Sequence, residues 1–102
     1  MKFSYFLEIL DALNRNDPHM TCICLSQIGD EGAKYIAEAL TKNSTLTHLY
    51  LSYNQIGDKG AKYIAGALAK NSTLTHLDLG SNQIGDEGAK HIEKILSKNR
   101  RS

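Results

Sequence analysis

The feature that most constrains this chain is a repeat of 28 residues. Two successive segments align without a gap, LTHLYLSYNQIGDKGAKYIAGALAKNST over 46–73 and LTHLDLGSNQIGDEGAKHIEKILSKNRR over 74–101. An earlier copy, QIGDEGAKYIAEALTKNST over 27–45, stands 28 residues before its equivalent, although its opening at Met20 is two residues shorter. A repeat of this size indicates an array in which each copy packs on its neighbour.

Each copy changes its hydrophobic period halfway along. Residues 49–51 and 77–79 alternate apolar and variable positions, which is typical of a strand with one buried face. The apolar positions that follow recur with the spacing of a helix, at Ala61, Ile64, Ala65 and Leu68. The Gly57-Asp58 pair suits a helix start, since acidic residues favour the first turn. We therefore predict an α/β chain with parallel strands on one face and helices on the other.

Both ends of the chain depart from the repeat. Residues 3–14 predict an amphipathic helix, whose apolar face is expected to carry Phe3, Phe6, Leu7, Leu10 and Leu13. We interpret this helix as a cap on the first repeat, with a membrane-binding or partner-binding helix as the alternative. Near the other end, Glu93 replaces an alanine of the earlier copies, which suits a helix that no further repeat follows. We predict one domain over 1–102, with a cap over 1–18 and repeats over 19–45, 46–73 and 74–102.

The stretch LTHLYLSYNQIGDKGAKYIAGAL resembles the leucine-rich repeat pattern L-x-x-L-x-L-x-x-N-x-I in its long, helix-containing form. This is the ribonuclease-inhibitor-like type, which is also found in NACHT-domain immune receptors and in proteins of intracellular bacteria. The resemblance implies a short curved solenoid, with its strands on the concave face and its helices on the convex face. It also implies a module that recognises proteins and catalyses nothing.

The asparagine of that pattern is present in two copies. Asn54 and Asn82 are expected to pair with backbone groups of the irregular turn that follows each strand. In the shortened first copy the nearest residue is Ser26, a weaker substitute. We predict that these three residues form a structural ladder. The sequences Asn-Ser-Thr at 43–45 and 71–73 are glycosylation signals in repeat turns, and we expect them to stay unmodified.

The residues between the inward leucines suggest a binding surface. In parallel strands in register they stack into columns about 4.8 Å apart on the concave face. Tyrosine, histidine and aspartate on a flat surface fit protein recognition, although a solvated face that binds nothing has the same pattern. The predicted partner-binding residues are His48, Tyr50, Ser52, Tyr53, His76, Asp78 and Ser81.

Two other functions stay open at this point. A metal-binding protein could use Cys22, Cys24, His48 and His76, although a Cys-x-Cys pair on a strand is wide for tetrahedral chelation. A small self-associating repeat protein is the other alternative, with a homodimer through the last repeat and Ile95 near the contact. We predict no catalytic residue, because no oxyanion hole or orienting acid accompanies Cys22 and His48. We also predict no cofactor and no bound metal.

Composition restricts the partner and the compartment. A formal net charge of +1 gives no reason to expect binding to nucleic acid or to a membrane. The N-terminal stretch is interrupted by Glu8 and Asp11 and lacks a cleavage site, so it does not read as a signal peptide. Two cysteines so close in sequence suit reduced thiols. We expect a cytoplasmic protein, or one that is exported without a cleaved signal peptide, with a protein as its partner.

Overall fold

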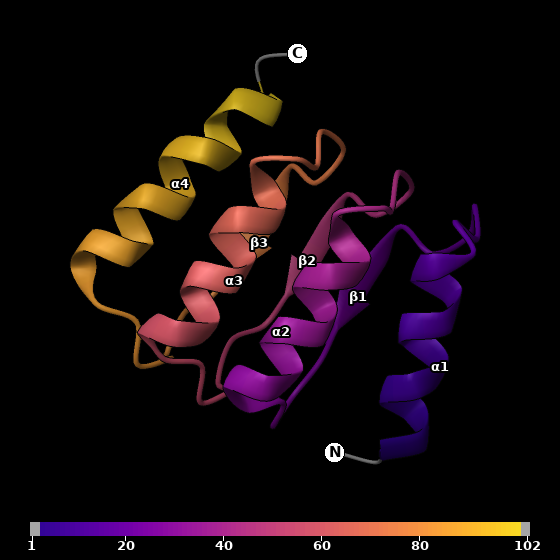
Figure 1. The fold of residues 1–102 in the computed structure, drawn as a ribbon, viewed down its shortest axis with the longest axis horizontal. Helices are drawn as coiled ribbons and strands as arrows, with labels where there is room; N and C mark the ends of the chain where they lie inside the picture. Colours follow the sequence, from indigo (N-terminus) through magenta and orange to yellow (C-terminus); the bar gives the residue numbers. More distant parts are fainter. Residues whose placement is uncertain (1–2, 101–102) are drawn as a thin grey trace.

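The computed structural model describes residues 3–100 and arranges them as four helices and a three-stranded parallel sheet (Figure 1). The elements alternate along the chain as α1 (Phe3–Asn14), β1 (Cys22–Cys24), α2 (Gly29–Leu40), β2 (His48–Tyr50), α3 (Asp58–Leu68), β3 (His76–Asp78) and α4 (Asp86–Arg100). This order confirms the predicted α/β class. The predicted segments 1–18 and 74–102 extend at residues 1–2 and 101–102 beyond the described part of the chain.

The sheet grows by one strand per repeat, in the order β1-β2-β3. Each strand has only three residues, and β2 and β3 each end one residue before the last residue of the alternating segments 49–51 and 77–79. The middle residue of β2, Leu49, is buried, while its two neighbours are more exposed. The strands lie in register with this apolar position aligned. Alternation in the sequence therefore fixes which side of the sheet faces the core.

The core lies between the sheet and the row of helices. It combines the leucines and isoleucine of the strand segments with the apolar stripe of each helix, and its fully buried members include Ile36, Leu40, Leu46, Leu49, Leu51, Ile56, Ile64, Leu68 and Leu74. Small residues occupy the helix positions between them, so the helices of consecutive repeats pack closely. One core therefore runs through the repeats.

The N-terminal helix α1 packs beside α2, at the end of the molecule where the first repeat lies (Figure 1). Its buried side chains include Phe6, Ile9 and Leu13, while Leu7 is 48% exposed. The predicted apolar face is thus wrong at Leu7, because the helix is rotated so that the i, i+3, i+7 row meets the core. The side chain of Phe3 lies outside the part of the chain that the structure describes.

The two ends of the array are covered unequally. Leu25 of the first repeat is buried, whereas the equivalent Leu79 of the last repeat is only partly buried. Ala61 on α3 is buried against the following repeat, and the equivalent Ala89 on α4 is exposed. The surface that each earlier repeat presents to its successor therefore stays open on the last repeat.

One polar contact partly occupies that open edge. The carbonyls of Thr21 and Thr47 each accept N–H groups from the next strand. The equivalent carbonyl of Thr75 instead accepts a hydrogen bond from Nε of Arg100, at 2.7 Å. Arg100 is also paired with Glu93 at 2.6 Å. The exposed Glu93 therefore pairs with the Arg100 guanidinium group, which in turn occupies the Thr75 carbonyl at the edge of the sheet.

The predicted asparagine ladder joins consecutive repeats. The Asn54 amide accepts from the Ile28 N–H and donates to the carbonyls of Leu25 and Ser52. Asn82 repeats this pattern one repeat later, since its Oδ1 accepts from Asn54 N–H and Ile56 N–H. Each asparagine thus bonds backward to the preceding repeat. Ser26 lies exposed and has no such bond among the described residues, because no repeat precedes it.

A second asparagine ladder lies at the opposite end of the helices, at the predicted glycosylation signals. Asn43 accepts from Leu46 N–H and donates to the carbonyl of Leu13, so it ties the first repeat to α1. Asn71 donates to the carbonyls of Leu40 and Asn43 and accepts from Leu74 N–H. All three members, Asn43, Asn71 and Asn99, are buried. These turns are therefore parts of the interior and not free loops.

An aspartate links the helix starts. Oδ1 of Asp30 accepts from the N–H groups of Gly57 and Gly60, at 2.7 and 3.0 Å, and both glycines belong to the next repeat. Asp58 accepts from Gly85 N–H in the same way at 2.8 Å. The Gly-Asp pair was predicted to act on the dipole of its own helix. The carboxylate instead bonds across the repeat boundary.

Candidate functional site

The predicted columns lie on one exposed face of the sheet. His48 is the Cα partner of Cys22 on one side and of His76 on the other, and Tyr50 stands between Cys24 and Asp78. Tyr50, His76 and Asp78 are exposed, and His48 is half-buried. We name the surface formed by His48, Tyr50, His76 and Asp78 the strand face. The structure brings these four predicted site residues together.

Ring contacts order the strand face. The imidazoles of His48 and His76 stack with their centroids 4.0 Å apart and their planes within 6° of parallel. The Tyr50 ring is tilted against His48 at 6.4 Å. The threonine before each histidine also contacts its ring, since Oγ1 of Thr47 lies 2.8 Å from Nδ1 of His48. Sequence analysis missed these threonines, although a Thr-His pair recurs in both repeats.

The remaining predicted site residues lie in the turns after the strands, not in columns of the sheet. Ser52 is half-buried, and its carbonyl accepts from the Asn54 amide. Tyr53 and Ser81 are exposed, and both have positive φ, at 58° and 54°. Ser52 follows the last residue of β2 by two positions, and Tyr53 and Ser81 follow β2 and β3 by three, so the predicted columns do not continue the sheet.

The cysteines leave the metal hypothesis without geometric support. Cys22 and Cys24 are free thiols on the exposed edge strand β1. Within residues 3–100, no three His, Cys, Asp or Glu side chains come together in a group that could hold a metal ion.

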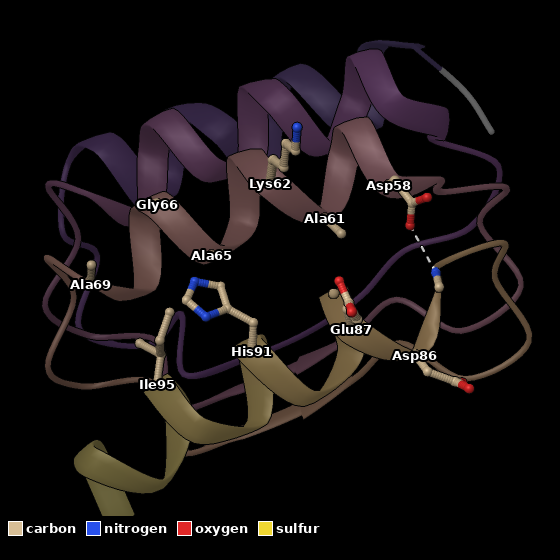
Figure 2. A pocket seen from close by; sticks show the side chains of 12 residues that line it. Asp58, Ala61, Lys62, Ala65, Gly66, Ala69, Asp86, Glu87, His91 and Ile95 are labelled. Carbon is tan, nitrogen blue, oxygen red and sulfur yellow. Dashed lines mark hydrogen bonds between the residues drawn. The ribbon is translucent and has the colours of Figure 1, made fainter.

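A groove of about 890 Å³ lies elsewhere, between α3 and α4 (Figure 2). It is lined by small residues of α3, including Ala61 and Ala65, and by Ala69, which directly follows that helix. Figure 2 shows His91 and Ile95 directed from α4 toward these alanines. Acidic side chains from the helix starts, including Asp86 and Glu87, line one end.

Ile95 therefore does not lie at the open end of the array, where sequence analysis expected it to mark a dimer contact. It faces α3 and lines the groove between α3 and α4. The equivalent residues of the earlier helices face the preceding helix in the same way. Ala67, for example, lines the seam between α2 and α3 and is buried. An isoleucine in this place adds bulk between α3 and α4, which fits the groove beside it.

The structure bears on membrane insertion as well. Within the described residues, no helix combines the length and the apolar character that crossing a bilayer requires.

Comparison with known proteins identifies the repeat. The family described as "Leucine Rich repeat" matches residues 25–37, 42–65 and 70–92, which together make up more than half of the chain. The chain belongs to the leucine-rich repeat family. The matched segments contain β2, β3 and most of α2 and α3, together with the beginning of α4, so the family pattern recurs with the repeat unit. Comparison with curated proteins finds no match.

Two solved structures share the fold of this leucine-rich repeat chain. The tropomodulin C-terminal domain of Caenorhabditis elegans superposes with a TM-score of 0.82 at 14% identity, over 93% of this chain and 59% of that domain. The structure of leiomodin-1 actin-binding site 2 gives a TM-score of 0.59 at 22% identity, over 94% of this chain and 90% of that one. The chain thus spans about three-fifths of the tropomodulin domain. At these identities the likeness concerns the fold alone.

Proposed function

We propose that this protein binds a partner protein through the strand face and the adjoining turns, and that it is not an enzyme. The predicted surface comprises His48, Tyr50, Ser52, Tyr53, His76, Asp78 and Ser81. The observation that carries the proposal is the exposure of two tyrosines, Tyr50 beside the stacked imidazoles and Tyr53 in the turn that follows. Tyr50 is 37% exposed and Tyr53 is 74% exposed. Exposed aromatic side chains on ordered backbone are typical of binding hot spots.

Tyr53 supports this proposal independently. Its φ of 58° lies in the left-handed region, where a bulky side chain is disfavoured. The equivalent residue of the next repeat is Ser81, at φ 54°, so the turn imposes this backbone and does not need a tyrosine. An aromatic ring at such a position stabilises neither the turn nor the core. Contact with another molecule accounts for it.

The finer features of the fold belong to this proposal. We propose a curved solenoid of the ribonuclease-inhibitor-like type, divided as 1–18, 19–45, 46–73 and 74–102, with α1 as its N-terminal cap. The burial of Phe6, Ile9 and Leu13 supports the cap. We further propose the cytoplasm as its location, or export without a cleaved signal peptide. Two exposed free thiols support a reducing compartment.

Actin is the first purified partner to test, because the leiomodin-1 structure is named as an actin-binding site. Co-sedimentation with actin filaments and binding to monomeric actin would decide this point. Binding that is lost in the double variant Tyr50→Ala/Asp78→Ala would assign actin to the strand face.

Site-specific photo-crosslinking tests the proposed surface without assuming a partner. A photoreactive phenylalanine analogue replaces Tyr50 in one variant and Tyr35, an exposed tyrosine on α2, in a matched control. A third variant carries it at Lys62, which lines the α3–α4 groove. The proposal expects one defined protein adduct from the Tyr50 position and none from Tyr35. An adduct from Lys62 alone would move the binding site to the groove and contradict the strand face.

Self-association through the last repeat is the second candidate. It is favoured by the apolar surface that the last repeat leaves open, which includes Leu77, Leu79 and Ala89. Two such surfaces could cover each other about a two-fold axis, as most homodimers do.

A further inference from the structure

The two histidines of the strand face make the same local contacts. Oγ1 of Thr47 lies 3.0 Å from the carbonyl oxygen of Thr21 and 2.8 Å from Nδ1 of His48. One repeat later, Oγ1 of Thr75 lies 3.3 Å from the Thr47 carbonyl and 2.9 Å from Nδ1 of His76. Each threonine hydroxyl therefore stands between a backbone carbonyl and an imidazole nitrogen.

The hydroxyl can donate only one hydrogen, and a carbonyl oxygen cannot donate. Both contacts of the hydroxyl are therefore hydrogen bonds at the same time only when its hydrogen points at the carbonyl. The contact to Nδ1 is then a hydrogen bond only if Nδ1 carries the hydrogen and the hydroxyl oxygen accepts it. In a neutral imidazole the lone pair is consequently left on Nε2. Within the described residues, Nε2 of His48 and of His76 has no hydrogen-bond partner.

We propose that Thr47 and Thr75 hold His48 and His76 in the Nδ1–H form, so that the strand face receives an arginine side chain of the partner. The inference rests on the proposed function and specifies its chemistry. The parallel rings place two Nε2 acceptors in adjacent strands, because their centroids are 4.0 Å apart. The face thus offers a pair of acceptors at its centre.

The surroundings of this pair favour a cationic donor. Asp78 is exposed and lies two residues after His76. Among the residues of β1, β2 and β3 it is the one that carries a formal charge. The Tyr50 ring lies beside His48 and offers a surface for stacking. A guanidinium group is planar, carries five N–H donors and no acceptor, and stacks on aromatic rings. An arginine therefore matches the acceptors, the negative charge and the ring together.

The tautomer can be measured on the free protein by nitrogen-15 NMR of the imidazoles under mildly alkaline conditions. Both rings are expected to carry their hydrogen on Nδ1. Thr47→Val should shift His48 alone toward the Nε2–H form, and Thr75→Val should shift His76 alone, so each variant is the control for the other. Thr47→Ser keeps the hydroxyl and should keep the tautomer. Nε2–H rings in the unmodified protein would overturn the proposal whatever the variants do.

The partner chemistry is tested by titration with N-acetyl-arginine amide, with N-acetyl-glutamate amide as the control of opposite charge. The arginine compound should shift the Cε1–H signals of both histidines, and the shift should be lost in Thr47→Val/Thr75→Val. Equal shifts with the glutamate compound, or arginine shifts that persist in the double variant, would overturn it. If both NMR results hold but crosslinking from position 50 captures no protein, the proposed function fails while the arginine site stands.

Discussion

Polar side chains at three positions connect each repeat to the next, and the same bonds recur every 28 residues. Asn54 and Asp30 form these hydrogen bonds on the side of the repeats where the helices begin. Asn71 forms them on the opposite side, where the helices end. All of these bonds satisfy backbone groups that no sheet or helix satisfies. Because a buried unpaired polar group costs more than a bond gains, each such residue contributes chiefly by preventing that loss.

Asn54→Ala should therefore lower the free energy of unfolding by about 1–3 kcal/mol. The substitution leaves Ile28 N–H and the Leu25 carbonyl without their partner in a fully buried place. Urea denaturation measures the change. Asn82→Ala, at a less buried site, should cost less. An unaltered unfolding midpoint for Asn54→Ala would show that the ladder does not stabilise the fold.

Asp30→Ala should cost about 1–2 kcal/mol, because two N–H groups of the next repeat lose a charged acceptor. Asp86→Ala is the matched control, since Asp86 is the same position in the last repeat and has no hydrogen bond among the described residues. Thermal melting compares the two variants, and Asp30→Asn should recover much of the loss because it retains an acceptor. Equal effects at both positions would indicate a role in the helix dipole alone.

Sequence alone predicted some of these residues and not others. Asn54 and Asn82 were recognised because they belong to the repeat pattern. The sequence places Asn71 in a repeat turn but does not predict its burial, because an Asn-Ser-Thr signal looks the same whether the amide is exposed or buried. Thr47 was missed for a similar reason. The value of its hydroxyl depends on a carbonyl 26 residues away, and this contact exists only once the strands pair.

At the scale of elements, the contribution of each α1 side chain to stability depends on whether it lies on the face that meets the first repeat. Leu13 is fully buried and its carbonyl accepts from the Asn43 amide, whereas Leu7 is half exposed. Leu13→Ala should therefore destabilise the fold by about 2–4 kcal/mol. Leu7→Ala should leave the unfolding midpoint almost unchanged. The reverse order would mean that α1 packs through the face that the sequence first indicated.

The elements were predictable because their signals are local and recur. Alternation predicted the strands, and the i, i+3, i+4, i+7 spacing predicted the helices. The rotation of α1 was not predictable, since Leu7 and Ile9 are both apolar and only the shape of the first repeat chooses between them. The alternation correctly predicted the residues of the strand face. It did not predict that Tyr53 and Ser81 lie outside the sheet, because the turn after each strand interrupts the pairing.

At the scale of the whole molecule, the open last repeat governs association. Ala33 and Ala61 each face the following repeat, close to Gly60 and Gly88. Ala89 is their equivalent and is exposed. If the last repeat pairs with its copy, the unmodified protein should sediment as a dimer at concentrations well above micromolar. Ala89→Lys should convert it to a monomer without altering its circular dichroism.

Tyr35→Lys is the control for this experiment, because it adds the same charge to an exposed helix position away from the last repeat. It should leave the dimer intact. Sedimentation of the unmodified protein as a monomer would exclude self-association, and the Arg100 contact to the Thr75 carbonyl would then be sufficient protection for the edge.

The buried amides of Asn43 and Asn71 restrict where such a chain can be made. Each opens a sequence to which glycosylating enzymes attach sugar. Sugar on Nδ2 would replace a hydrogen that is donated inside the protein, to Leu13 or Thr45 in one case and to Leu40 or Asn43 in the other. The attached glycan and the closed array exclude each other. A nascent chain in a glycosylating compartment must fold before the transferase reaches it, or it loses the ability to fold.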